Sequence, residues 1–274
     1  MLNWHDIDGQ RFRSTPRGFS RVLVSCLLAV LLTVTAKTQA AATETRHQHW
    51  IESASAGLDA RAVDTLQRIH GADRQLLALR AYLRAGDSLA TRWSWSQDTL
   101  TRYPSTPEGQ AAAADIDRVI AVFAKENPGY ELQVNREPRS LETQLAHWND
   151  NASVGTVAAA LAASLEQRFA DSASPTAEEL RDALAHWTPD TAAALAAPGL
   201  SAHGQGRAFD FAVSRDGRIV AGLEAASANA KWDAAGWTRK LRQAVVASGK
   251  PFVGPLQSPY EPWHYVYTPW RLHD

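Results

Sequence analysis

Residues 207–221 read RAFDFAVSRDGRIVA, and this stretch decides the fold. Residues 207–213 have the pattern of a β-strand, with Asp210 on the same face as two small alanines. Arg215, Asp216 and Gly217 form a turn signal, and residues 219–221 are again apolar. The stretch therefore predicts an antiparallel hairpin.

The sequence on either side adds strands and helices to this hairpin. Residues 130–135 alternate between apolar and polar, as do residues 264–267, where His264 lies opposite Tyr265 and Tyr267. Apolar residues at helical spacing predict helices over residues 106–127, 154–169, 176–187 and 237–248. We expect an α+β fold in which helices flank a small antiparallel sheet.

The chain divides into three predicted segments. An apolar run over residues 22–34 follows several arginines and precedes small residues, so residues 1–40 are predicted to be a signal peptide. Residues 41–105 read as a helical extension and residues 106–274 as the main domain. His47 and His49 are expected to be a solvated pair in the extension. If these helices are only an extension, deleting residues 41–105 leaves the activity of the main domain intact.

The leader predicts where the protein works. Cleavage near Ala40 or Ala42 would export the chain to the periplasm or the extracellular space, with no stable membrane span left. Two alternatives remain open. Cys26 resembles a lipoprotein cleavage site, and the apolar run could stay uncleaved as an amino-terminal anchor.

Composition excludes several classes of protein. The 274 residues are 45% hydrophobic and 21% charged, values typical of a folded globular protein. The formal net charge is -1, and no basic cluster points to nucleic acid as a partner. The single cysteine excludes thiolate zinc sites, so any metal must be held by histidine or carboxylate ligands.

One combination of residues suits a metal. His203 lies in a glycine-rich loop, Asp210 follows on the strand, and His264 comes from the last strand. Two histidines and one carboxylate leave one position open, which is the pattern of a catalytic zinc site. We therefore expect these three residues to be the ligands of one zinc ion.

The same residues carry a family resemblance. Residues 201–210 follow the pattern S-x-H-x-x-G-x-A-x-D, and residues 261–264 read E-P-W-H. This resembles the zinc D-alanyl-D-alanine metallopeptidases, the carboxypeptidases and dipeptidases that trim peptidoglycan stem peptides. The resemblance covers residues 112–268 and implies that Glu261 is the general base.

The resemblance also implies substrate-binding residues. The family has an arginine in a Tyr-Arg-Ser segment, which matches Arg139 and Ser140, with Gln144 downstream. Here Pro138 replaces the aromatic residue, so Arg136 remains a rival for the role. Ser201 either contacts substrate or caps a turn.

Together with the predicted leader, the resemblance implies an exported zinc peptidase acting on peptidoglycan stem peptides, most simply a D-alanyl-D-alanine carboxypeptidase. An endopeptidase of the same fold is an alternative, as is an inactive zinc-containing module that binds the cell wall. The helical extension could serve as an envelope scaffold in either case. No serine has a lysine three positions later, which disfavours the serine route to the same reaction.

Overall fold

The structure, a computed structural model, describes residues 38–39, 41–172 and 174–269. The chain forms two compact units, Met1–Arg46 and His47–Asp274, and all labelled elements lie in the second. The predicted signal peptide, including Cys26, lies outside the described residues except for residues 38 and 39. No helix in the described part of the chain has the length and apolar character to cross a membrane.

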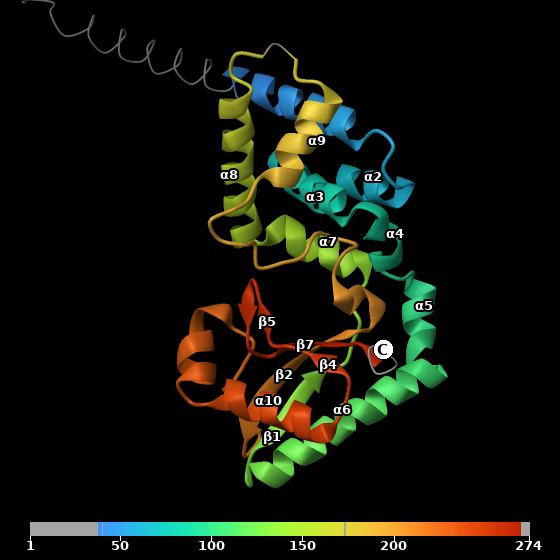
Figure 1. The fold of residues 1–274 in the computed structure, drawn as a ribbon, viewed down its shortest axis with the longest axis vertical. Coiled ribbons are helices and arrows are strands. Elements are labelled where there is room, and N and C mark those ends of the chain that lie inside the picture. The colour runs from blue at the N-terminus through green and yellow to red at the C-terminus, as the bar shows by residue number, and fades with distance from the viewer. Residues whose placement is uncertain (1–37, 40, 173, 270–274) are drawn as a thin grey trace, which may run out of the picture. The chain divides into compact units, whose positions relative to one another are not determined.

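The second unit contains a helical lobe and a sheet lobe (Figure 1). The helical lobe comprises residues 47–95 and 141–200 and contains a helical segment at residues 47–55, followed by α2 (Ala60–Gln67), α3 (Ala72–Ala85), α4 (Leu89–Arg92), α7 (Leu141–Asp150), α8 (Ala152–Arg168) and α9 (Ala177–His186). Helix α3 packs against α8 and α9. A short helix, α5 (Gln97–Arg102), leads from this lobe to the sheet lobe.

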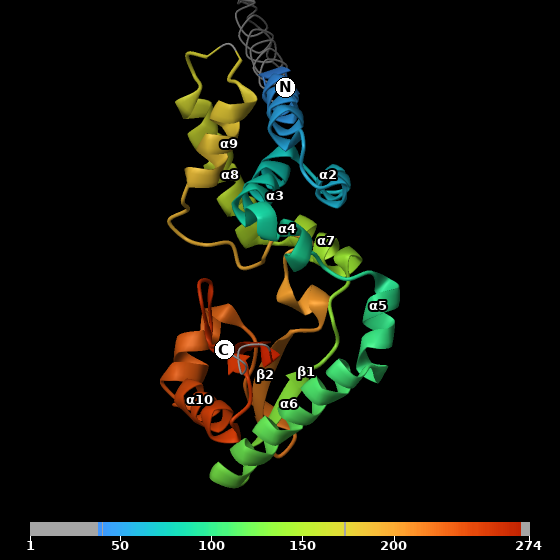
Figure 2. The ribbon, with the colours of Figure 1, turned by 45° about the vertical axis from the view of Figure 1, so that its right-hand side comes forward.

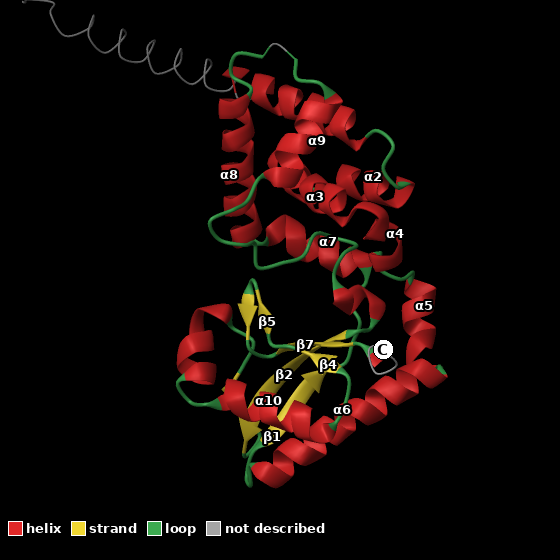
Figure 3. Cartoon of the chain, in the orientation of Figure 1, coloured by secondary structure: helices red, strands yellow, loops and turns green. Residues whose placement is uncertain are grey.

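The sheet lobe contains the long helix α6 (Pro107–Glu126), α10 (Trp237–Ser248) and the strands (Figures 2 and 3). The strands are β1 (Glu131–Asn135), β2 (Ala208–Arg215), β3 (Arg218–Ala221), β4 (Phe252–Val253), β5 (Leu256–Gln257), β6 (Tyr260–Glu261) and β7 (His264–Tyr267). The main sheet has the order β1-β2-β7-β4, with β3 also paired to β2, and β5 and β6 form a separate two-stranded sheet. Every pairing is antiparallel.

Alternation along β2 separates the two faces of the sheet. Phe209, Phe211 and Val213 are buried in a core shared with α6 and α10. Because successive side chains in a strand point to opposite faces, Asp210 lies on the face away from these helices. The apolar core thus fixes which face of the sheet carries the polar residues.

A second core holds the helical lobe together. Its members come from residues 47–55, α2, α3, α4, α7, α8 and α9, and the largest fully buried ones include Trp50, Tyr82 and Trp148. The helices before residue 105 therefore share one core with α7, α8 and α9. The domain boundary between residues 105 and 106 stays a prediction. Helices on both sides of it pack into the same core.

The α+β fold with a small antiparallel sheet is confirmed. The hairpin turns at Asp216 and Gly217, which both have positive φ, as a tight turn of this type requires. His264 and the tyrosines lie on opposite faces of β7 as expected, since Tyr265 and Tyr267 are buried in the core beside α6 and α10. The sequence did not predict the β5–β6 hairpin.

The expectation of a solvated histidine pair was wrong for His47. This side chain is 3% exposed, and its ring stacks on Trp50 with the centroids 5.1 Å apart. Its Nδ1 lies 3.0 Å from an Asp73 carboxylate oxygen, and its Nε2 lies 2.8 Å from one of Glu166. Only the protonated ring can donate from both nitrogens. Burial by itself lowers the pKa of His47, but the two carboxylates outweigh it and raise the pKa above its usual value.

We predict that His47 makes the stability of the fold depend on pH. Because its pKa is raised on folding, the stabilisation is complete below the unfolded pKa of about 6.5 and is lost as pH rises through the folded pKa. His47→Gln should cost about 1–3 kcal/mol at pH 6 and less at pH 9. Urea unfolding at both pH values measures this, with the exposed His186→Gln as the control. Equal losses at both pH values for His47→Gln would contradict the prediction.

Candidate metal centre

Two of the predicted ligands are brought together by strand pairing. Asp210 on β2 is the direct cross-strand partner of His264 on β7. Directly opposed residues of an antiparallel pair point to the same face, so the carboxylate and the imidazole meet. His264 Nδ1 lies 3.0 Å from Asp210 Oδ1.

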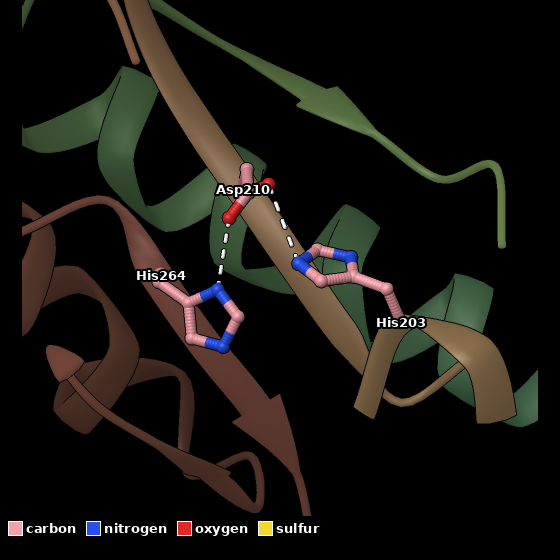
Figure 4. Close-up of side chains that lie close together, drawn as sticks. All are labelled: His203, Asp210 and His264. Carbon is pink, nitrogen blue, oxygen red and sulfur yellow. Dashed lines mark hydrogen bonds and ion pairs between the residues drawn. The ribbon is translucent and has the colours of Figure 1, made fainter. Parts of the chain in front are cut away.

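The third ligand comes from a short turn before β2. His203 lies in a 3-10 turn, Ala202–Gln205, which ends at Gly206 in the left-handed conformation. This turn directs the ring back over the sheet, and His203 Nε2 lies 3.4 Å from Asp210 Oδ2 (Figure 4). His203 and Asp210 are only 5% and 4% exposed.

The donor atoms of this group fit a metal ion. One ligand atom from each of His203, Asp210 and His264 lies within 4.8 Å of the others. Zinc bonds of about 2.0–2.1 Å in a tetrahedral arrangement place the donors roughly 3.3 Å apart. The distances of 3.0 Å from His264 Nδ1 to Asp210 Oδ1 and of 3.4 Å from His203 Nε2 to Asp210 Oδ2 are of that order, and they run to the two different oxygens of the carboxylate. The buried His203-Asp210-His264 group can therefore bind a metal ion.

The charge states of the ligands also suit a cation. Burial lowers the pKa of His203, against the opposing effect of Asp210, and so favours the neutral ring that a metal needs. Burial alone would raise the pKa of Asp210, but hydrogen bonds and charges from His203 and His264 hold it far below its usual value. The group thus presents an ionised carboxylate and a neutral imidazole.

Glu261 and Arg139 lie beside the three ligands. Glu261 Oε2 is 3.7 Å from His264 Nδ1, and burial raises the pKa of Glu261 above its usual value. Arg139 donates from Nη2 to Asp210 Oδ2 at 2.7 Å, and its backbone N–H donates to the carbonyl of His203. The rival Arg136 instead pairs with Asp117 on α6 and does not line the cleft around the ligands.

The three remaining sequence candidates have different surroundings. Ser201 lines the cleft. Ser140 does not, and its hydroxyl caps α7 by accepting from the N–H of Thr143. Gln144 is buried; its Nε2 donates to the Ser94 hydroxyl and to the carbonyl of Arg139, and its Oε1 accepts from the N–H of Gly199. The amide of Gln144 therefore holds together the segments around the centre.

The metal group lies in a cleft of about 700 Å³ that both lobes line. The sheet lobe contributes the ligands, Glu261 and Trp263. The helical lobe contributes residues of α3, α7 and the segment 189–200. The sequence did not indicate that the amino-terminal helices reach this site.

Hydrogen bonds tie residues 91–95 of the helical lobe to residues 199–205, a segment that includes the turn carrying His203. The N–H of Ser94 donates to the carbonyl of Gly199, and that of Trp95 donates to the carbonyl of Gly204. Gln205 Nε2 donates to the carbonyls of Thr91 and Trp93. We call residues 91–95 the strap. The glycines of residues 199–206 were the available sequence signal for such a close approach.

We predict that Gly204→Ala disturbs both the fold and the metal centre. A Cβ at Gly204 would lie 2.0 Å from the Ser94 hydroxyl and 2.5 Å from Gln144 Nε2, so the strap must move. Such overpacking costs about 1–3 kcal/mol, and it displaces the turn that carries His203. Thermal unfolding and calorimetric zinc titration measure the two effects.

The matched control is Gly222→Ala, where the three heavy atoms nearest to an added Cβ all belong to the flexible side chain of Glu224. This variant should keep zinc affinity. Wild-type zinc affinity and melting temperature in Gly204→Ala would show that the strap does not position His203.

Comparisons with known protein families, with curated proteins and with solved structures found no match for this chain.

Proposed function

We propose that this protein is an exported zinc-dependent peptidase that hydrolyses peptidoglycan stem peptides, most simply as a D-alanyl-D-alanine carboxypeptidase. The observation that carries the proposal is the buried His203-Asp210-His264 group in an open cleft, with Glu261 beside it. The motifs at residues 201–210 and 261–264 supply the substrate class by resemblance.

His203, Asp210 and His264 would hold the ion. A zinc ion held there would polarise the scissile carbonyl and would lower the pKa of a bound water to about 7. The raised pKa of Glu261 suits a group that takes up a proton on its carboxylate and returns it to the leaving amine. Hydrolysis then joins the water oxygen to the carbonyl carbon as the C–N bond breaks.

In this proposal Arg139 contacts both the metal ligand Asp210 and an oxygen of the substrate. Its side chain is 30% exposed in the cleft while Nη2 stays on Asp210. The guanidinium has five N–H donors, so donors remain for a substrate oxygen. A planar, permanently charged group fixed in this way can stabilise negative charge that develops on that oxygen.

Mass spectrometry of purified muropeptides tests the proposal. The protein is incubated with them alone, with a chelator, and with zinc restored. Loss of one terminal alanine, abolished by the chelator and recovered with zinc, is the expected result. A cut within the stem or the cross-bridge would make the protein an endopeptidase. Intact muropeptides with zinc bound would refute catalysis and favour the binding module.

A further inference from the structure

The helical lobe gives the cleft a wall of one charge. Among the described residues, the acidic side chains that line the cleft are Asp210 and Glu261, and both lie at the metal centre. Besides Arg139, which pairs with Asp210, the permanently charged lining residues are Arg80 on α3 and Arg92 at the end of α4. Apolar residues, many of them alanines of the segment 192–197, fill most of the rest.

The side chain of Arg80 is held in place by Trp187 and not by a carboxylate. Its Nε and Nη2 donate to the carbonyl of Trp187 at 2.9 and 2.7 Å, and its guanidinium lies 5.5 Å from the Trp187 ring centre. Burial, and secondarily the charge of Arg84, lowers the pKa of Arg80. Among the described residues, no carboxylate forms an ion pair with Arg80. Arg80 is half-buried, and a partly desolvated charge without a counter-ion is stabilised when an anion is supplied.

Two further side chains of the cleft lining, Arg92 and Trp148, are also hydrogen-bond donors. Arg92 is exposed, and within the described part of the chain it has no ion-pair partner. Trp148 also lines the cleft, and its buried indole N–H has no acceptor among the described groups. Arginine and tryptophan side chains only donate hydrogen bonds. A ligand that contacts the two arginines must therefore supply acceptors, preferably charged ones, whereas the Trp148 N–H is enclosed.

We propose that the helical wall binds a carboxylate of the peptide substrate, located upstream of the scissile bond, and that Arg80 and Arg92 select it. This inference rests on the proposed peptidase function. It assigns the helices before residue 105 a direct part in substrate selection. The lining of the cleft is mostly apolar, which suits the rest of the peptide.

A set of paired peptides tests the inference. Three acetylated peptides ending in D-Ala-D-Ala are used, each with a single glutamate at a different position upstream of the scissile bond. Each is compared with a peptide that has glutamine at the same position. At one position we expect kcat/KM to favour glutamate by about tenfold, mainly through KM. Arg92→Gln and Arg80→Gln should bring that ratio towards one.

Arg118→Gln, an exposed arginine on α6 outside the cleft, is the control and should keep the preference. A ratio near one at all three positions would overturn the proposal, as would an unchanged ratio in both cleft variants. Because Arg92 is exposed, its variant remains informative if Arg80→Gln fails to fold.

Binding separates this inference from the peptidase proposal. If the zinc-loaded protein cleaves no peptide, the proposed function fails, and fluorescence anisotropy with fluorescein-labelled peptides decides the inference. Tighter binding of a glutamate peptide than of its glutamine partner, lost in Arg92→Gln, would support it. Equal binding of both peptides would refute it.

Discussion

His264→Ala is expected to abolish tight metal binding. The imidazole supplies one of the three protein donor atoms, and its Nδ1 is 3.0 Å from the Asp210 carboxylate. Even a residue that only supports a metal ligand contributes about 10–100-fold to affinity. Loss of a ligand itself should therefore weaken binding by more than about 100-fold, and hydrolysis should disappear with the metal. Calorimetric titration and the metal content after dialysis measure the effect.

The control is His147→Ala. This exposed histidine lines the same cleft but is not one of the grouped ligands, so its removal should leave the metal content at one ion per chain. Full metal loading of His264→Ala would show that His264 is not a ligand of the bound ion. The folded state of both variants is checked by circular dichroism.

Glu261→Gln is expected to separate metal binding from catalysis. Glutamine keeps the size of the side chain but accepts no proton at neutral pH, so turnover should fall by about 10²–10⁴-fold. Zinc affinity should change by only a few-fold, because Glu261 is not one of the three grouped ligands. Steady-state kinetics on a D-alanyl-D-alanine peptide and zinc titration measure the two quantities.

Glu224→Gln provides the comparison. This exposed carboxylate pairs with Lys231 and does not line the cleft, so the substitution should change neither the turnover nor the zinc affinity. Loss of zinc from Glu261→Gln would instead make Glu261 a ligand. Wild-type turnover in Glu261→Gln would remove it from the mechanism.

Much of the sheet lobe could be predicted because local patterns determine it. Alternation along β2 and β7 is a local property, and it places Asp210 and His264 on the face opposite the core. Capping signals are local too, and Thr176 and Glu179 form the capping box that their spacing indicates. The meeting of the three ligands followed from the family resemblance together with these faces.

The composition of the cleft could not be predicted because it depends on contacts between distant segments. Arg80 and Arg92 lie more than a hundred residues before His203, and no local pattern connects them with it. His47 illustrates the same limit, because its partner Glu166 is 119 residues away. Added Cβ atoms at Gly199, Gly204 and Gly206 would collide with residues 93, 94 and 103 or with Gln144, but the glycines alone do not identify the segments that pack there.

We expect the strap to make unfolding of the two lobes cooperative. The N–H of Trp95 donates to the carbonyl of Gly204 in the turn that carries His203, and Gln205 Nε2 in the same turn donates to the carbonyls of Thr91 and Trp93, so separating the lobes would leave these groups unpaired. A chain lacking residues 41–105 loses these bonds together with half of the helical core, and is not expected to keep the centre assembled. Zinc should accordingly raise the melting temperature of both lobes together, in a single calorimetric transition.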